Sequence, residues 1–369
     1  MRDVWDLAVV GAGPAGAAAA RAAADAGARV LLIEKAEIPR YKRCGGGLIG
    51  PAQQALADSG VDVAGLSRDL VGRFTFTHRG RRGFTREAQP FLPMVLRSEL
   101  DATLVGLAQE AGTELTTGVT VSAFAEQDGL VTLGTSGGPV RARAVVAADG
   151  SASRASAYVG VHCDLVDIGL EAELPRPPGS DWDGHVLLDW GPVPGSYGWV
   201  FPKGDVLTVG VIGSRDQGPA MRDYYRAFVA SLGLDLGTAI HDGGHQTRVR
   251  TAGSPLRRGQ VLVAGDAAGL LEPWTREGIS FALRSGRLAG LAAVGELPSY
   301  EEAVESALGA EVAAGRRALA VFTRRPGVVH RVMRTPPLWP LLQELVSGRT
   351  TMADQLERRR VRWLVSLVE

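Results

Sequence analysis

Short apolar runs bounded by polar or glycine-rich segments mark the beginning of the chain. Residues 7–10 and 30–33 are uncharged and apolar, a pattern typical of buried parallel strands. Residues 14–26, between these runs, begin with proline, are rich in alanine and precede Gly27, which predicts a helix. The order of strand, helix and strand predicts a βαβ unit.

The middle of the chain has the shorter period of β-structure. Residues 165–213 alternate apolar and polar positions with little helical signal, which predicts an antiparallel sheet. Further strands are expected at 114–125, 130–135, 139–148 and 261–264. Helices are expected at 99–111 with Ser98 as the N-cap, at 219–232, and from 277 onward with breaks near Gly295, Pro298, Pro326 and Pro336.

This succession predicts an α/β (α+β) protein with a Rossmann-type domain, an inserted antiparallel β-sheet and a helical C-terminal region. The Rossmann-type domain, which would bind a dinucleotide, is expected to be discontinuous. We expect it to comprise residues 1–70, 95–160 and 250–297, with a β-rich substrate domain at 71–94 and 161–249 and the helical region at 298–369.

Composition restricts the partners and the compartment. Hydrophobic residues make up 45% and charged residues 22% of the 369 residues, which suits a globular protein with a sizeable core. The 40 Lys and Arg balance the 40 Asp and Glu, so charge gives no argument for nucleic-acid binding. Cys44 and Cys163 cannot form a disulfide framework, the six histidines lack metal-ligand spacing, and no apolar run suits a transmembrane helix. We expect a cytoplasmic protein without metal or nucleic acid.

The motif Gly11-Ala12-Gly13-Pro14-Ala15-Gly16 lies between the first predicted strand and helix. Its first glycine permits a tight turn, its second lets a pyrophosphate approach the backbone, and its third lets the helix pack on the strand. The free N–H groups at the helix start would face the phosphates. Glu34 ends the next strand, where its carboxylate can accept hydrogen bonds from ribose hydroxyls. Together these residues predict a dinucleotide site.

Two later Asp–Gly pairs indicate which dinucleotide is bound. Asp149-Gly150 and Gly265-Asp266 each follow a predicted strand. At such a strand end, the Asp266 carboxylate can accept a hydrogen bond from a ribityl or ribose hydroxyl. Each pair alone suits a plain turn. In this order after the N-terminal motif they resemble the FAD-binding family of the p-hydroxybenzoate hydroxylase type, and Arg97 matches an FAD-contacting arginine of that family. The resemblance implies FAD, with further contacts at Lys35, Arg40, Cys44, Gly45, Gly46, Val121, Gly278 and Ile279.

Two segments resemble one branch of these flavoproteins. They are Arg40-Tyr41-Lys42-Arg43-Cys44-Gly45-Gly46-Gly47-Leu48 and Tyr197-Gly198-Trp199-Val200-Phe201-Pro202, the latter followed by Gly210. Both are similar to motifs of the geranylgeranyl reductase family, which saturates isoprenoid double bonds. The resemblance covers most of the chain. The sequence departs from the family at three positions. Proline is frequent where Arg43 stands, a different ring or aliphatic residue is frequent at Trp274, and a smaller residue is usual at Arg276.

Three aromatic residues, Tyr197, Trp199 and Phe201, stand at alternate positions, so on a strand they share one face. This face is expected to line a substrate cavity; the alternative is a face packed on the protein's own core. Cys44 lies among basic residues, which favour the thiolate, although a small buried apolar role is the alternative. We expect the isoalloxazine ring to lie between the Cys44 segment and the three rings, with Cys44, Tyr197 and Trp199 as catalytic residues.

The segment before the helix at 277 is expected to border the flavin. Gly278 and Ile279 would begin a helix whose positive N-terminus faces the N1/O2 edge of the flavin and stabilises its reduced form. Arg276 would add positive charge there, or would pair with Glu272 or Glu277 in solvent. The expected substrate contacts are Tyr197, Trp199, Phe201, Trp274 and Arg276.

Together, these expectations predict an FAD-dependent reductase. It would saturate carbon–carbon double bonds of an apolar isoprenoid or polyene-like substrate by hydride transfer from N5 of the reduced flavin, with NADPH or another electron donor. The alternative is a flavin-dependent monooxygenase or halogenase of bacterial natural-product metabolism, although the three lysines (35, 42 and 203) include no dedicated halogenase lysine. A prenyl-binding escort protein without flavin is a third hypothesis, against which the glycine motif argues. Peripheral membrane contact and the oligomeric state stay open.

Overall fold

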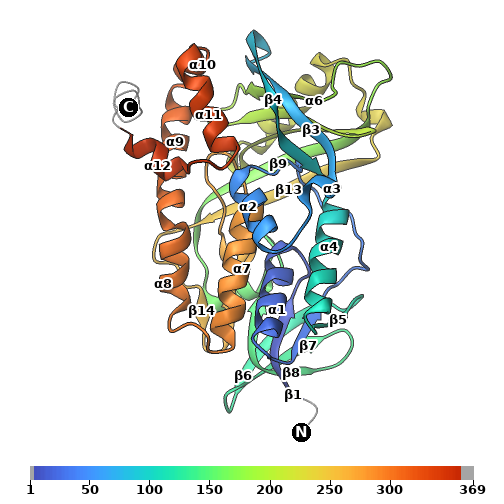
Figure 1. Ribbon diagram of the computed structural model, residues 1–369, viewed down its shortest axis with the longest axis vertical. Coiled ribbons are helices and arrows are strands. Elements are labelled where there is room, and N and C mark those ends of the chain that lie inside the picture. The colour runs from blue at the N-terminus through green and yellow to red at the C-terminus, as the bar shows by residue number, and fades with distance from the viewer. Residues whose placement is uncertain (1–3, 359–369) are drawn as a thin grey trace.

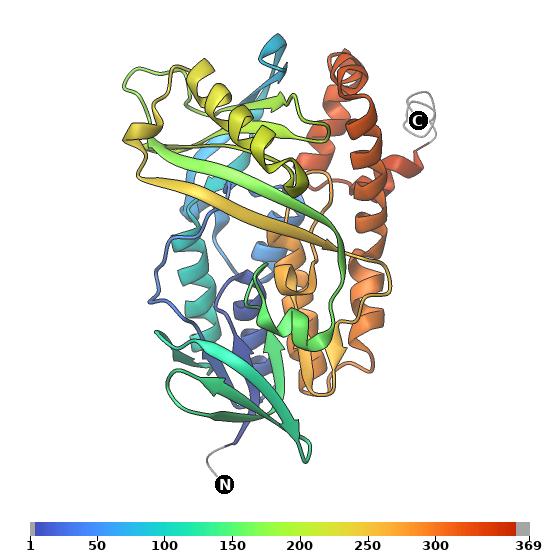
Figure 2. The ribbon, with the colours of Figure 1, turned by 180° about the vertical axis from the view of Figure 1, so that it is seen from behind.

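The computed structural model describes residues 4–358 and contains two β-sheets, one above the other in Figure 1, with helices packed along them (Figures 1 and 2). The first sheet has the strand order β14-β15-β8-β1-β2-β5, and β7 joins it to β6. β1 pairs in parallel with β2 and β8, as the buried apolar runs predict. Its strands are β1 (Val4–Val10), β2 (Val30–Ile33), β5 (Glu114–Thr116), β6 (Val121–Gln127), β7 (Leu130–Thr135), β8 (Val140–Ala147), β14 (Arg257–Arg258) and β15 (Val261–Val263).

Three helices pack beside one another against the parallel strands of this sheet: α1 (Pro14–Asp25), α4 (Arg97–Glu110) and α7 (Ile279–Ala293). α7 approaches α1 closely, because a Cβ atom on Gly286 would overlap the backbone of Ala15. The expected N-cap at Ser98 is wrong. α4 begins one residue earlier, at Arg97, after Leu96, and no side chain caps its first turn.

The second sheet has the order β13-β9-β12-β11-β10-β3-β4 and is antiparallel except where β10 pairs in parallel with β3. The antiparallel sheet expected over 165–213 is therefore confirmed, with one parallel neighbour from an earlier part of the chain. Its strands are β3 (Ser67–His78), β4 (Arg81–Val95), β9 (Cys163–Pro175), β10 (His185–Trp190), β11 (Tyr197–Lys203), β12 (Val206–Ser214) and β13 (His241–Arg250).

The two faces of the second sheet have different partners. Val200, Val209 and Val211 point to one face and pack on Tyr224 and Phe228 of α6 (Gly218–Ser231). Because side chains alternate along a strand, the residues between them point to the opposite face.

The remaining helices complete the chain. α2 (Gly50–Asp58), α3 (Val63–Leu66) and α5 (Arg154–Val159) are short and lie in connections between strands. The C-terminal helices run along one side of the molecule (Figure 1): α8 (Tyr300–Val304), α9 (Ala310–Arg324), α10 (Pro326–Met333), α11 (Trp339–Val346) and α12 (Met352–Glu357). The breaks expected near Gly295, Pro326 and Pro336 are confirmed, and the last part of the expected helical region, 359–369, lies outside the described residues. Over residues 4–358, each helix is too short or too polar to cross a membrane.

Candidate cofactor and substrate site

The glycine motif forms a tight turn between β1 and α1. Gly11 has φ +96°, and a Cβ atom there would lie 2.5 Å from the carbonyl oxygen of Ala148 at the end of β8. A Cβ atom on Gly16 would overlap the Gly11 carbonyl, so helix and strand meet without a side chain between them. Gly13 is the N-cap residue and Pro14 the first residue of α1, and no side chain caps the first-turn N–H groups. Such a helix start is suited to a phosphate.

Glu34 lies beside this turn and is buried. Its carboxylate accepts hydrogen bonds from the backbone N–H groups of Ala12, at 2.8 Å, and Ala36, at 3.2 Å. Arg40 Nη2 also lies 3.3 Å from it. The carboxylate therefore connects the glycine turn to the end of β2, while its expected role toward a ribose stays a prediction.

Arg40 and Arg97 share one buried carboxylate, that of Asp101. Arg40 Nη1 lies 3.1 Å from Asp101 Oδ2, and Arg97 binds both oxygens at 2.8 and 2.9 Å. A Cβ atom on Gly13 would stand 3.9 Å from a nitrogen of each guanidinium. Although burial lowers the pKa of Arg97, the Asp101 carboxylate raises it further, to a value above the usual one. Two fixed positive charges thus face the turn where a pyrophosphate is expected. No motif in the sequence singled out Asp101, which lies one helical turn after Arg97 in α4.

The two Asp–Gly pairs lie at the ends of neighbouring strands. Asp149 follows β8 and accepts a hydrogen bond from the Arg154 N–H at 3.0 Å, while its other oxygen is buried with no partner among residues 4–358. Asp266 lies in a 3₁₀ turn (Gly265–Ala268) after β15. A Cβ atom on Gly278 would stand 3.5 Å from Asp266 Oδ1, so the start of α7 lies beside this carboxylate. α7 begins at Ile279, as predicted.

Lys42 and His245 also lie beside Asp266. Lys42 Nζ lies 3.3 Å from His245 Nδ1, and His245 Nε2 lies 4.0 Å from Asp266 Oδ2. Burial, and then the charge of Lys42, lower the pKa of His245 to about 4, so its ring is neutral at pH 7. His245 belongs to β13, and its distance from Lys42 in the sequence left no local signal.

The other expected cofactor residues lie in three separate segments. Lys35 is exposed directly after Glu34, and Val121 is half-buried at the start of β6. Gly46 has φ +81°, which favours glycine, and Cys44 Sγ accepts a hydrogen bond from its N–H at 3.4 Å. The Cys44 side chain is half-buried.

The aromatic residues of β11 share one face, as predicted. The ring centroids of Tyr197 and Trp199 are 6.0 Å apart, and those of Trp199 and Phe201 6.2 Å. The Tyr197 hydroxyl donates to the carbonyl oxygen of Thr275 at 2.6 Å, and burial raises its pKa. Trp199 Nε1 is buried without an acceptor in the described chain. This face joins the apolar cluster around Trp190 and is distinct from the face covered by α6.

The expected position of a ring between the Cys44 segment and all three aromatic residues is wrong at one end. A Cβ atom on Gly45 would lie 2.8 Å from two atoms of the Phe201 ring, so the two residues touch and nothing fits between them. Lys203 explains this contact. Its Nζ donates to the Cys44 carbonyl oxygen at 2.8 Å and pairs with Glu173, which holds the glycine segment against the sheet.

A buried acid lies next to Trp199. Gly210 of β12 pairs with Trp199 on one side and Glu171 of β9 on the other. A Cβ atom on Gly210 would overlap the indole and stand 2.8 Å from Glu171 Cβ, so only glycine leaves room for both side chains. Glu171 Oε1 is buried and has no hydrogen-bond partner among residues 4–358, and burial raises the pKa of this carboxyl. Nothing in the sequence singled out Glu171.

Arg276 has neither of the solvent partners expected for it. Its Nε lies 2.9 Å from Asp167 Oδ2, and the two side chains are only 4% and 5% exposed. Its guanidinium also lies 5.4 Å from the Tyr197 ring centroid. Glu272 instead accepts hydrogen bonds from backbone N–H groups of its own turn, and Glu277 accepts from Ser280. Asp167 lies on β9, far away in the sequence, so Arg276 fastens the loop before α7 to the second sheet.

Trp274, in the same loop, packs into the aromatic cluster. Its ring centroid lies 6.1 Å from that of Phe322 in α9, which in turn lies 5.1 Å from Trp190. The structure thus places Tyr197, Phe201 and Trp274 in one apolar cluster. Trp199 lies between Tyr197 and Phe201 on the same strand face, and Arg276 lies over the Tyr197 ring.

Comparisons with known proteins agree with this architecture. Residues 6–162 match the family model of FAD dependent oxidoreductases. Digeranylgeranylglycerophospholipid reductase 1 of Methanopyrus kandleri is 34% identical over 320 residues, which cover 79% of this chain and 80% of the relative.

Solved structures share the whole fold. A geranylgeranyl bacteriochlorophyll reductase-like protein from Thermoplasma acidophilum has a TM-score of 0.77, 22% identity and complete coverage of both chains. A flavin-dependent brominase has a TM-score of 0.74 and 19% identity over 98% of this chain and 97% of its own. The glycine turn with its two arginines and the aromatic strand therefore occur in an enzyme that belongs to the geranylgeranyl reductase family of FAD-dependent oxidoreductases.

Proposed function

We propose that this enzyme saturates carbon–carbon double bonds of an apolar isoprenoid substrate. The observation that carries the proposal is the aromatic face of β11, which lies against the Cys44-Gly45 segment rather than against α6. The Methanopyrus relative, named for reduction of a digeranylgeranyl lipid, supports it. Bound FAD, once reduced by NADPH or another donor, would supply the hydride.

The residues present fit this cofactor. The N–H groups at the start of α1, with Arg40 and Arg97, would hold its pyrophosphate. Glu34 would bind the ribose, and Asp266 the ribityl chain. The unpartnered oxygen of Asp149 is a further acceptor for a hydroxyl group at this edge of the sheet.

On the substrate side, Tyr197, Trp199, Phe201 and Trp274 would provide an apolar wall that excludes water. Burial of a chain contributes about 0.8 kcal/mol per CH₂ group, so a prenyl chain needs little polar recognition along its length. This figure is an upper limit for binding, because association entropy opposes it.

Saturation of a double bond also requires a proton donor. Glu171 is suited to this role, because burial raises the pKa of its carboxyl and its Oε1 has no partner in the described chain. The Tyr197 hydroxyl already donates a hydrogen bond to the carbonyl oxygen of Thr275, so its role is to position the loop before α7. We therefore assign proton donation to Glu171. Cys44, whose carbonyl oxygen accepts a hydrogen bond from Lys203, would border the substrate.

Because isoprenoid lipids reside in membranes, the proposal includes a cytoplasmic enzyme with peripheral membrane contact. It is tested by mixing photoreduced enzyme with a panel of prenyl alkenes under argon. We expect flavin reoxidation and a product heavier by two hydrogens for each bond. Reoxidation that never exceeds the blank would contradict the proposal. Oxygen consumption coupled to a hydroxylated or halogenated product would instead favour the monooxygenase or halogenase, which the fold likeness to the brominase supports.

A further inference from the structure

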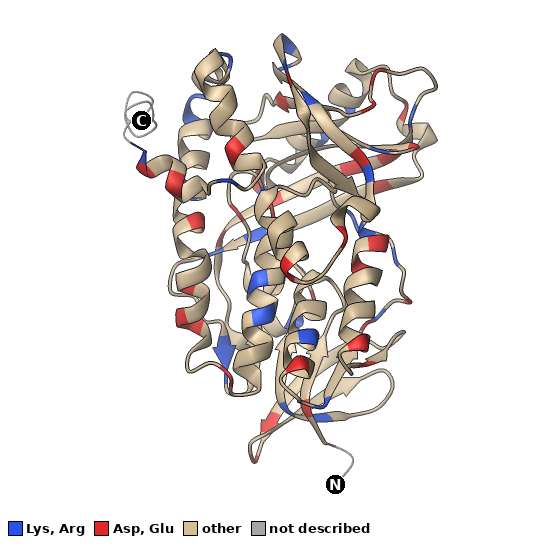
Figure 3. Cartoon of the chain, in the orientation of Figure 1, with Lys and Arg blue, Asp and Glu red and all other residues tan. Residues whose placement is uncertain are grey.

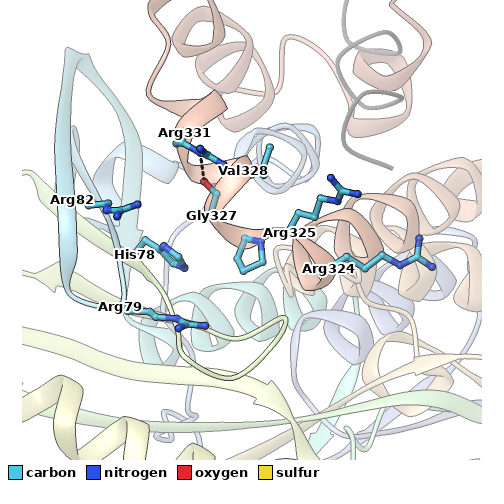
Figure 4. Close-up of a pocket in the computed structure, with 9 residues that line it drawn as sticks. His78, Arg79, Arg82, Arg324, Arg325, Gly327, Val328 and Arg331 are labelled. Atoms are coloured by element: carbon cyan, nitrogen blue, oxygen red, sulfur yellow. Dashed lines mark hydrogen bonds between the residues drawn. The ribbon is translucent and has the colours of Figure 1, made fainter.

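A cavity lies beside the apolar cluster that contains Trp190 and Tyr197. Its volume is about 420 Å³, and it lies between the tip of the β3–β4 hairpin and the beginning of α10 (Figure 4). It is lined by His78, Arg79, Arg82, Arg324, Arg325 and Arg331. The chain as a whole is neutral, and Figure 3 shows basic and acidic residues scattered over both sheets and the helices. Five arginines around one cavity are therefore a local accumulation of charge.

These arginines lack acidic partners. Among residues 4–358, no carboxylate pairs with Arg79, Arg82, Arg324 or Arg325. The nearby acid, Asp189, is buried, and its carboxylate accepts hydrogen bonds from Thr77 and from the Gly80 N–H. Within the described part of the chain, the positive charge of the cavity is therefore not neutralised by carboxylates.

The backbone around the cavity is held in place. Arg79 and Arg82 have φ of +55° and +54°, a conformation that costs a non-glycine residue about 1 kcal/mol. Asp189 binds the turn next to Arg79, and the buried His330 binds the Arg82 carbonyl at 2.8 Å. A Cβ atom on Gly327 would stand 3.4 Å from His78, so the start of α10 packs on the hairpin. The positive φ values belong to the tight turn between β3 and β4 and to the first residues of β4, so the two arginines are held in fixed positions at the tip of the hairpin.

The cavity adjoins the apolar cluster around Trp190. Tyr197 pairs with Trp190 across β11 and β10, and Trp190 pairs with His78 across β10 and β3. Two strand spacings of about 4.8 Å separate Tyr197 from His78, or roughly 10 Å. The same apolar cluster includes Phe201, Tyr197, Trp190 and Val329 of α10. His78 lines the cavity, so a head bound at the arginines would lie about two strand spacings from the Tyr197 end of the aromatic face, with the buried Trp190 between them.

We infer that these arginines form the binding site for the phosphate-bearing head of the prenyl substrate, a refinement that rests on the proposed function. Guanidinium groups bind phosphate oxygens in pairs, which combines charge with orientation. The bound head group would fix how far the prenyl chain extends past Trp190 toward Tyr197. It would therefore select which double bond reaches the cofactor.

The test uses one double variant, Arg79→Gly/Arg325→Ser, in the FAD-loaded enzyme. Glycine adopts the positive φ at position 79 without steric cost, and serine is a preferred N-cap residue for α10 at position 325. The variant is therefore expected to fold. The control, Arg222→Ser/Arg226→Ser, removes the same charge from exposed positions of α6. Three probes are compared: inorganic pyrophosphate, geranylgeranyl diphosphate, and the uncharged alcohol geranylgeraniol.

We expect the double variant to bind pyrophosphate about tenfold more weakly in calorimetry, the equivalent of one strong charged contact. Its KM for the diphosphate should rise about tenfold with kcat nearly unchanged, whereas its KM for the alcohol should stay within about twofold. The control should match the wild type. Equal losses for diphosphate and alcohol, or unchanged pyrophosphate binding, would overturn the inference.

Two further outcomes separate the inference from its neighbours. If the wild type reduces neither prenyl probe, the proposed function fails. The anion site is still tested, because the wild type should bind pyrophosphate and the double variant should bind it more weakly. If the variant loses only its sedimentation with phosphatidylglycerol vesicles, the arginines face a membrane surface and the head-group assignment is overturned.

Discussion

Phe201 of β11 lies directly on Gly45, close enough that a Cβ atom there would stand 2.8 Å from the ring. Gly45→Ala should therefore push the glycine segment away from the sheet, at a cost of about 1–3 kcal/mol for overpacking. We expect weaker FAD binding and a lower reductase rate, measured by flavin titration and single-turnover kinetics. Adding Phe201→Leu should restore part of both.

Gly47→Ala is the matched control, because its Cβ atom would stand 3.5 Å from Met94, an ordinary contact. Equal losses in the two alanine variants would show that the Phe201 contact has no special role.

The Arg276–Asp167 pair should be the most costly ion pair to break. Arg276→Met leaves the Asp167 carboxylate buried without a partner, which we expect to lower the free energy of unfolding by about 3–5 kcal/mol. Urea unfolding measures this loss. Arg143→Met, which removes an exposed partner of Asp6, should cost less than about 1 kcal/mol. A similar cost for both would contradict the burial argument.

Glu171 should make stability depend on pH. The pKa of Glu171 is raised in the folded state. Between the ordinary pKa of glutamate and this raised pKa, the folded protein binds more protons than the unfolded chain. The free energy of unfolding therefore falls as the pH rises between these two pKa values. Glu171→Gln removes that contribution, so its stability relative to the wild type should increase from pH 4 to pH 8. Glu272 and Glu277, also buried with raised pKa values, keep a remaining slope of the same sign.

The same variant tests the proton assignment. Glu171→Gln should slow the alkene reaction while leaving FAD binding unchanged, and the solvent deuterium isotope effect on that step should change. Glu173→Gln, which leaves Lys203 without its carboxylate, should instead destabilise the protein. A normal alkene rate in Glu171→Gln would remove Glu171 from the reaction.

Asp101 should control FAD affinity without touching the cofactor, because it holds Arg40 and Arg97 in place. Asp101→Asn weakens hydrogen bonds to charged groups, worth about 1.5–3 kcal/mol, so the Kd for FAD should rise roughly tenfold or more. Asp25→Asn, at the exposed end of α1, is the control and should leave the Kd unchanged. Tight FAD binding by Asp101→Asn would show that the arginines are positioned by other contacts.

Local sterics and periodicity allowed the sequence to determine part of this protein. The turn at Gly11 and Gly16, the carboxylate of Glu34 and the start of α7 after Gly278 follow from residues close together in the chain. The shared face of Tyr197, Trp199 and Phe201 follows from the period of two in a strand. Helix ends were less certain, since α4 begins at Arg97 without any side-chain cap.

Only the tertiary structure decided the partners. Arg276 pairs with Asp167, Lys42 meets His245, and Phe201 touches Gly45, all across more than one hundred residues of chain. Glu171 is a buried acid because the register of β9, β12 and β11 places Gly210 between it and Trp199. Such pairings depend on which strands become neighbours and in what register, and a periodic pattern shows which face a residue takes but not what lies opposite it.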